Sequence, residues 1–374
     1  MKIEIEPKDL LYAIAIASRL GTLLNKEAVI LEVSPEDKTF YLQMRGDYAR
    51  IRIAVAKHEE TTRELVSIQT QGLSKLLKST KNKVLIGKSG KQLDIKTTDE
   101  GSKGRFITPT IEILVWDFAW EKIENDSQVA RVEAELLKKA YEFALVSTAK
   151  IADRPSRVIQ TGITISTTES SLVVEGHNEY SMSRYQTDYQ PLSTEQKFIS
   201  TVIRPQLLHV LKDVDDKYIT LSINNEKFQA TTENIQLISS IISNDPVNLD
   251  SVRNSIQKNG TWTIKKEDIV YIVKSILQAL NYQGRLIRSL TLEFYKNKIV
   301  IRTASNDVGR GKLSIPNPTY SGTEMKLLVD GKAFADALSK SNGEEVNVFV
   351  SEPGGLIFIK GNSTEYAATT EFCR

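Results

Sequence analysis

The sequence predicts an α+β protein of three similar domains in tandem, each with two helices packed on antiparallel sheets. Three stretches support this prediction, because each has an extended apolar entry, an acidic residue and an apolar pair that opens an amphipathic helix. The acidic residues are Asp9, Glu135 and Asp268, which suit the positive end of a helix dipole. Successive copies lie about 130 residues apart, which is the length of one domain.

Each opening helix is followed by a segment in which apolar and polar residues alternate, as is typical of strands. These segments cover residues 29–55, 161–187 and 289–315. Turn-forming residues interrupt the alternation at Pro35–Asp37, Glu169–Ser171 and Lys296–Asn297. Each segment is therefore expected to form paired strands.

A second helix and a further hairpin complete each repeat. Amphipathic spacing predicts these helices at residues 71–80, 205–214 and 331–340. Alternation predicts the hairpins at residues 83–98, 217–232 and 347–362. Polar stretches near residues 121–128 and 243–254 separate the repeats. We therefore expect domains at residues 1–126, 127–253 and 254–374.

The composition fits a water-soluble protein of the cytoplasm. Apolar residues make up 40% of the chain, enough for a packed core, yet no run is long enough for a transmembrane helix. The charged start indicates a strand that leads into a helix, not a signal peptide. Cys373 is the only cysteine, which excludes an internal disulfide and favours a reducing cytoplasm. The net charge of +2 means that any nucleic-acid surface must come from uneven placement of charge.

The pair Gly176–His177 raises the question of a catalytic or metal-binding corner. When the three repeats are superimposed, it falls opposite Gly46–Asp47 and Ser305–Asn306. Gly, Asn and Asp tolerate the positive φ that turns need, so we expect a hairpin connection here. The sequence offers no set of converging metal ligands and no nucleophile beside a base. No catalytic residue, metal or cofactor is therefore expected.

Basic residues recur on and beside the predicted helices of all three repeats. Lys75 and Lys78 lie three residues apart on a helix whose leucines form the opposite face. A solvated helix face explains a single stripe of this kind, but a threefold recurrence favours a surface for phosphate backbones, indifferent to base sequence. The predicted DNA-binding residues are Lys75, Lys78, Lys150, Arg154, Arg157, Arg204, Arg285 and Arg288.

Four stretches, taken in chain order, carry a family resemblance: residues 162–182, the third opening helix, residues 319–338 and the YAATTEF end. Together they make the chain similar to the bacterial DNA polymerase III β sliding clamp family, as a divergent member that would suit a phage or plasmid. The resemblance implies a head-to-tail homodimer that forms a ring, with residues 104–108 paired against residues 280–282. It also implies that double-stranded DNA passes through the ring, and that no reaction is catalysed.

The resemblance further implies a pocket that binds short linear peptide motifs of the DNA polymerase and the clamp loader. Its residues would be Val174, Gly176, His177, Val252, Ile287, Ala367, Ala368, Thr369 and Phe372. This chain departs from the family pattern after His177, where it has Asn178 and Glu179, and in its C-terminal strand. A more polar pocket follows from these changes. Two alternatives are a ring scaffold or decoy that does not encircle DNA, and an enzyme with an unrecognised site.

Overall fold

The computed structural model describes most of the chain. The described residues are 1–21, 28–45, 48–97, 104–110, 128–150, 157–192, 200–212, 214–224, 226–255, 260–279, 289–305, 309–316, 319–351, 356–369 and 371–372. They form two compact units. The first unit contains Met1–Glu135, Gln190–Lys197 and Gln206–Ile241, and the second contains Leu136–Tyr189, Phe198–Pro205 and Ile242–Arg374.

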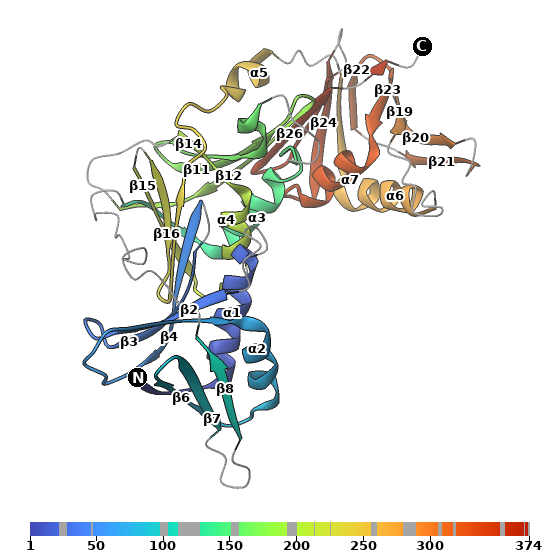
Figure 1. Ribbon diagram of the computed structural model, residues 1–374. Helices are drawn as coiled ribbons and strands as arrows, with labels where there is room; N and C mark the ends of the chain where they lie inside the picture. The colour runs from blue at the N-terminus through green and yellow to red at the C-terminus, as the bar shows by residue number, and fades with distance from the viewer. Residues whose placement is uncertain are drawn as a thin grey trace. The chain divides into compact units, whose positions relative to one another are not determined.

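The first unit holds two antiparallel sheets (Figure 1). The larger sheet has the order β13 (Gln190–Pro191), β9 (Gln128–Glu133), β15 (Tyr218–Ile223), β16 (Lys227–Thr231), β17 (Ile235–Ser240), β4 (Ala49–Lys57), β3 (Thr39–Arg45), β2 (Ala28–Ser34) and β5 (Glu64–Gln69). The smaller has the order β1 (Lys2–Ile5), β6 (Val84–Ser89), β7 (Gln92–Thr97) and β8 (Arg105–Pro109).

Two helices of the first unit pack on each other, α1 (Pro7–Gly21) and α2 (Thr70–Ser79). The buried face of α1 includes Leu10, Ala13 and Ala17, which follow helical spacing, and α1 also contacts β3 and β4. A third helix, α4 (Pro205–Leu211), belongs to this unit from Gln206 onward.

The second unit also holds two antiparallel sheets. The larger has the order β14 (Ser200–Ile203), β10 (Ile163–Thr167), β11 (Ser171–His177), β12 (Ser181–Asp188), β26 (Thr364–Thr369), β25 (Leu356–Lys360), β24 (Glu345–Ser351), β18 (Gly260–Lys265) and β22 (Thr319–Gly322). The smaller has the order β21 (Gly309–Pro316), β20 (Lys298–Ser305), β19 (Ser289–Tyr295), β23 (Met325–Asp330) and β27 (Glu371–Phe372).

The helices of the second unit are α3 (Ala134–Ala144, in this unit from Leu136), α5 (Leu249–Ser255), α6 (Lys266–Ala279) and α7 (Gly331–Lys340), with a 3-10 turn, η4, at Val158–Thr161. α6 packs against α7, and Lys340 of α7 donates through Nζ to the Glu142 carbonyl of α3 at 3.0 Å. Asp330 caps α7 by accepting from the Ala333 N–H at 2.9 Å.

The predicted α+β class and the repeat of helix, strands, helix and strands are confirmed. All six predicted helices form, as α1, α2, α3, α4, α6 and α7. The alternating segments form the strand triplets β2–β4, β10–β12 and β19–β21, and each predicted second hairpin also forms. No helix in the described part of the chain is long and apolar enough to cross a membrane.

Main-chain hydrogen bonds cross both predicted domain boundaries. β17 pairs with β4, for example at Ile235 and Ile53, and β12 pairs with β26, for example at Met182 and Ala367. Because each nine-stranded sheet runs on from one predicted domain into the next, compactness divides the described chain into two units. The domain bounds at residues 1–126, 127–253 and 254–374 remain a prediction.

One local prediction was wrong. Gly176 and His177 do not form the hairpin turn, because β11 continues through both, and the turn follows at Asn178–Tyr180. The Asn178 side-chain oxygen closes this turn by accepting from the N–H groups of Tyr180 and Ser181, both at 2.8 Å. A helix that was not expected, α5, lies in the polar stretch at residues 243–254, and the placing of a domain boundary there remains a prediction.

The first prediction concerns Gly176. A methyl group at this position would clash with the Ala144 carbonyl oxygen, which is backbone and cannot rotate away. Gly176→Ala should therefore lower the free energy of unfolding by about 1–3 kcal/mol, measured by urea denaturation. Gly87→Ala is the control, because its added carbon would meet only ordinary contacts, the nearest at 3.7 Å. Equal stability of the two variants would contradict the close approach of α3 to β11.

Candidate functional site

The hairpin β11–β12 presents two chemically different faces. On one face, Gly176 lies against the end of α3, and Ser183 donates through Oγ to the Ala144 carbonyl at 3.0 Å. Side chains alternate along a strand, so Glu175 and His177 point to the opposite face. Arg184, the cross-strand partner of Glu175, also lies on that face and contacts α5. The candidate site lies on this second face, under α5.

A pocket of about 460 Å³ opens on the α5 face. The end of β11, the turn that follows it and the last residues of β26 form much of its lining. The lining residues are Arg157, Gln160, His177, Asn178, Glu179, Tyr180, Ser181, Met182, Val247, Leu249, Leu356, Ala367, Ala368 and Thr369. All of them belong to the second unit.

The floor of the pocket is apolar. It rests on a buried cluster formed by Met182, Leu249, Phe358 and Ala367, with Val247 and Phe349 packed against it. The rings of Phe349 and Phe358 contact each other at a centroid distance of 5.7 Å and a tilt of 46°. Neighbouring strands and α5 each contribute to this cluster, so its shape depends on β12, β25, β26 and α5 together. An apolar side chain of a ligand would bury its surface here.

His177 is the polar group set deepest in this lining. Its side chain is 5% exposed, and neither ring nitrogen has a hydrogen-bond partner among the described residues. Burial lowers the pKa of His177 from its ordinary value, because the charged imidazolium is desolvated. The neutral ring therefore has one donor and one acceptor that no described residue satisfies. This arrangement suits a hydrogen bond to a bound ligand rather than proton transfer.

The rim of the pocket includes a cationic side chain, Arg157, and an aromatic side chain, Tyr180. Arg157 is exposed, and its main-chain N–H donates to the Gln160 side chain at 3.3 Å, which shapes the turn η4. Tyr180 is 69% exposed, and its carbonyl accepts from the Thr369 N–H at 2.8 Å, which ties the β11–β12 turn to the end of β26. An extended ligand would therefore meet a cation and an aromatic ring beside the apolar floor.

The structure gathers some of the predicted pocket residues and separates others. His177, Ala367, Ala368 and Thr369 line the pocket. Val174 and Gly176 do not line it, because alternation turns both toward α3, and their part in a peptide site stays a prediction. Ile287 lies outside the described residues, as do the side chains of Val252 in α5 and Phe372 in β27.

Sequence reasoning missed Met182, Leu249 and Tyr180. Met182 is the cross-strand partner of His177, so the hairpin register would have found it had the turn been placed correctly. Asn248 before Leu249 and Asp250 is a helix-start pattern, since the Asn248 side chain accepts from the Asp250 N–H at 3.1 Å. That signal was present in the sequence but was assigned to a boundary.

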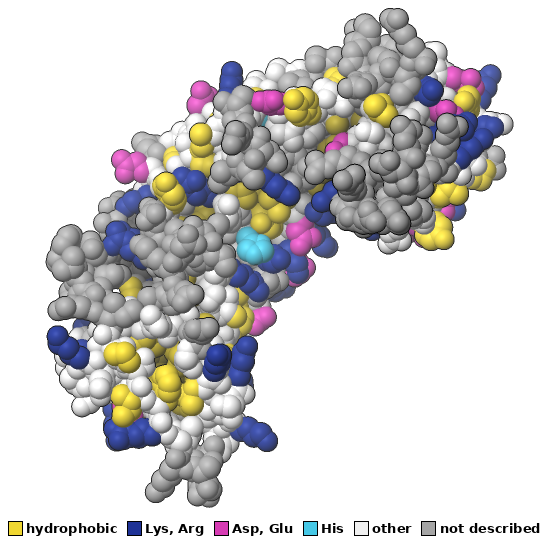
Figure 2. All heavy atoms as spheres, turned by 45° about the vertical axis from the view of Figure 1, so that its right-hand side comes forward, with side chains coloured by type: hydrophobic (Ala, Val, Ile, Leu, Met, Phe, Trp, Pro, Cys, Tyr) yellow, Lys and Arg dark blue, Asp and Glu magenta, His cyan; other side chains and the backbone are white. Residues whose placement is uncertain are grey.

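The predicted DNA-binding residues are placed unevenly. On α2, Leu73 and Leu77 are buried while Lys75 and Lys78 are exposed on the other side of the helix. Lys150 is exposed just after α3, and Arg204 is partly exposed just before α4. Figure 2 shows several Lys and Arg side chains on the face that it presents.

The remaining predicted DNA-binding residues are not described beside a helix of this group. Arg157 lies at the pocket, and Arg154, Arg285 and Arg288 lie outside the described residues. Other helices add exposed lysines, namely Lys8, Lys139, Lys274, Lys332 and Lys340. Within the described ranges, no three His, Cys, Asp or Glu side chains are grouped so that they could hold a metal ion.

The second prediction follows from the lowered pKa of His177. The unfolded chain binds a proton at His177 near its ordinary pKa of 6.5, and the folded chain does so only at lower pH. Stability should therefore fall as the pH drops below about 6.5 and continue to fall down to the folded pKa. His177→Gln should remove this contribution, so the loss of stability over that window becomes smaller in urea denaturation. An unchanged pH profile would contradict the burial of a neutral His177.

Comparison with known proteins finds matches for the structure of this chain but none for its sequence. No family model matches the sequence, and no curated protein matches it. Solved structures that match over 100% of both chains include the DNA polymerase sliding clamp of Bacillus subtilis (TM-score 0.85, 15% identity), the DNA polymerase III subunit β of Pseudomonas aeruginosa (0.84, 13%) and that of Thermotoga maritima (0.82, 14%). The chain thus has the fold of the DNA polymerase III β subunits over its full length.

Proposed function

We propose that this protein is a non-enzymatic DNA sliding clamp. Two copies would close a ring around duplex DNA and tether a DNA polymerase, and a clamp loader would load the ring. The observation that carries the proposal is the match of fold over the whole length of solved sliding clamps at low sequence identity. A cytoplasmic location, expected from the single cysteine, belongs to the same proposal.

The exposed lysines on the helices support contact with DNA. Lys75 and Lys78 of α2 are exposed, and neither pairs with an acidic side chain among the described residues, so they can reach phosphates without a fixed geometry. Contacts of this kind add affinity and salt dependence but no preference for a base sequence. Lys150, Arg154, Arg157, Arg204, Arg285 and Arg288 are also proposed to contact phosphates. Loose contacts are required, because tight ones would stop a clamp from sliding.

The pocket on the α5 face supports binding of a short linear peptide. Its apolar floor would bury one or two bulky side chains, each contributing about 1.5–3 kcal/mol on full burial. His177 would supply a hydrogen bond, and the exposed Tyr180 ring a contact surface. Affinity from so few anchors is moderate, which lets one partner replace another.

An edge strand supports assembly with a second copy. β8 ends the order of its sheet and pairs only with β7 among the described strands, so no described strand occupies the edge that a second copy would pair with. The expected partner, residues 280–282, lies outside the described residues. A closed homodimer follows if the rotation between the copies closes.

The third prediction tests encirclement of DNA. With a clamp loader supplied, the protein should stay on a closed circular duplex and slide off after the circle is cut. Lys75→Ala with Lys78→Ala should reduce the slope of log K against log salt by about two units, because two phosphate contacts are lost. Lys88→Ala with Lys91→Ala is the control, since these exposed lysines lie on the β6–β7 hairpin and not on a helix. Equal retention on circular and cut DNA would favour the scaffold alternative.

The fourth prediction tests the peptide pocket. The probe is a short labelled peptide that carries one leucine and one phenylalanine, measured by fluorescence anisotropy. Leu356→Asp should weaken its binding at least about tenfold, because Leu356 lies on the same strand face as Phe358 and an unpaired charge would enter an apolar cleft. Asn362→Asp adds the same charge in the same unit outside this pocket, so its affinity should match the parent. Equal affinity of all three proteins would place the peptide elsewhere.

A further inference from the structure

One wall of the pocket depends on a short helix that lacks a large buried face of its own. α5 has seven residues and brings Leu249 onto the cluster of Met182, Phe358 and Ala367, while Val247 just before it packs on the same cluster. The Asn248 side chain fixes the first turn by accepting from the N–H groups of Asp250 and Ser251, at 3.1 and 3.3 Å. Helices this short are marginal alone, so tertiary contacts must hold α5 in place.

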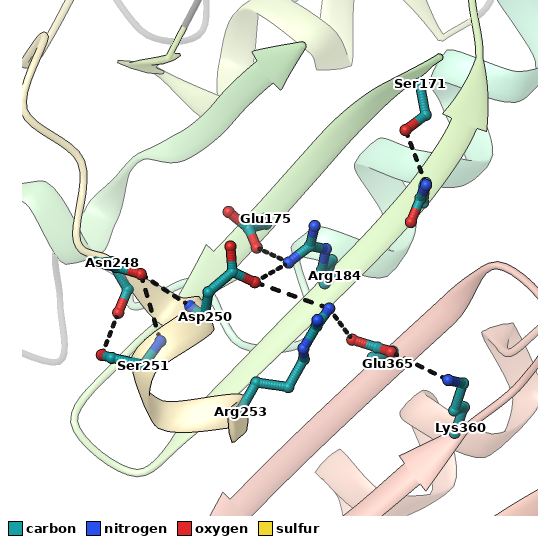
Figure 3. Close-up of polar contacts among 10 residues, drawn as sticks. Ser171, Glu175, Arg184, Asn248, Asp250, Ser251, Arg253, Lys360 and Glu365 are labelled. Atoms are coloured by element: carbon teal, nitrogen blue, oxygen red, sulfur yellow. Dashed lines mark hydrogen bonds and ion pairs between the residues drawn. The ribbon is translucent and has the colours of Figure 1, made fainter. Parts of the chain in front are cut away.

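A chain of alternating charges supplies those contacts (Figure 3). Arg184 of β12 lies 2.6 Å from Asp250 and 3.5 Å from Glu175 of β11. Arg253 of α5 lies 3.2 Å from Glu365 of β26 and 3.7 Å from Asp250. We call Arg184, Asp250, Arg253 and Glu365 the α5 latch, since both charged residues of the helix engage a charge on the sheet.

The α5 latch and the pocket floor occupy neighbouring rows of the same sheet face. Glu175, Arg184 and Glu365 are cross-strand partners, and they form one row. His177, Met182 and Ala367 are also cross-strand partners, two residues further along each strand, and they form the next row. α5 spans both rows, because Asp250 meets the first and Leu249 the second. A change in the charged row would therefore alter the position of α5 and of the pocket wall that Leu249 forms.

The burial of the charges sets how firmly the α5 latch holds. Arg184 is 15% exposed and anchored beside Glu175, whose pKa is raised by burial while Arg184 opposes that rise. Asp250 is 56% exposed, so water and salt screen its pair with Arg184. Arg184 is thus held firmly on the sheet, whereas its pair with Asp250 of α5 is weak enough to break.

We infer that Arg184 is a positioning residue for the pocket: by pairing with Asp250 it holds α5 so that Leu249 and Val247 form the pocket wall over His177. This role in ligand binding rests on the proposed function, since it concerns the same pocket. When the pair with Asp250 is lost, α5 moves away from the sheet, the wall opens and water reaches His177. The affinity of an uncharged peptide then falls as salt is raised, although the peptide itself carries no charge.

The fifth prediction uses two variants that remove opposite charges. Arg184→Met and Asp250→Asn should each raise the pKa of His177 toward 6.5, followed by NMR, and weaken the uncharged Leu-Phe peptide about fivefold. Loss of a cation raises a histidine pKa by electrostatics alone, whereas loss of an anion lowers it. A rise in both variants therefore reports the opening of α5. Arg184→Lys should restore part of the affinity.

The control is Arg302→Met, which breaks a matched Glu–Arg pair between adjacent strands of the same unit. Arg302 lies 2.9 Å from Glu293, far from α5 in sequence and on the other sheet, so the His177 pKa should not change. A parent-like His177 pKa and parent-like hydrogen exchange of α5 in Asp250→Asn would overturn the inference. A raised pKa with no peptide bound by any protein, the parent included, would support the α5 latch and count against the proposed peptide site.

Discussion

The pairing of β12 with β26 is the contact on which the second unit and its pocket depend. It joins strands that are about 185 residues apart in the chain, and it makes one sheet of nine strands out of two shorter sets. The register sets Met182 opposite Ala367, which places the end of β26 beside the β11–β12 turn. A shift of β26 by one residue would turn Ala367 to the α3 face and away from Met182, and the apolar floor would be lost.

The same register places close helix packing on one face of the sheet and the pocket on the other. On the α3 face the helix end comes so close that position 176 must be glycine, and Ser183 satisfies the Ala144 carbonyl. On the α5 face the same strands carry a row of charges and a row of apolar groups. The first face fixes the hairpin by close packing, and this rigidity lets the second face present His177 at a set depth. Structural and binding residues therefore alternate along β11.

Local periodicity explains which parts of the fold were predictable from the sequence. The six helices and their hairpins follow from patterns that lie within about 20 residues, so they were found. α5 was missed because a seven-residue polar helix has little periodicity, and the turn after His177 was misplaced because Gly176 is needed for close packing, not for positive φ. The pocket floor joins Met182, Leu249 and Phe358, and no local pattern relates such distant residues.

The weak parts of the site fit a surface that binds and releases partners. His177 bears the cost of lost hydrogen bonds in the fold, and a ligand that supplies a partner atom would recover that cost. The α5 wall is held by charges that are partly open to water, so it offers a defined shape without the rigidity of a core. A ligand that adds contacts to Leu249 would stabilise α5 and the pocket together, because the same side chain belongs to the helix and to the pocket floor. Reversible binding then follows from the same weak pairs that position the wall.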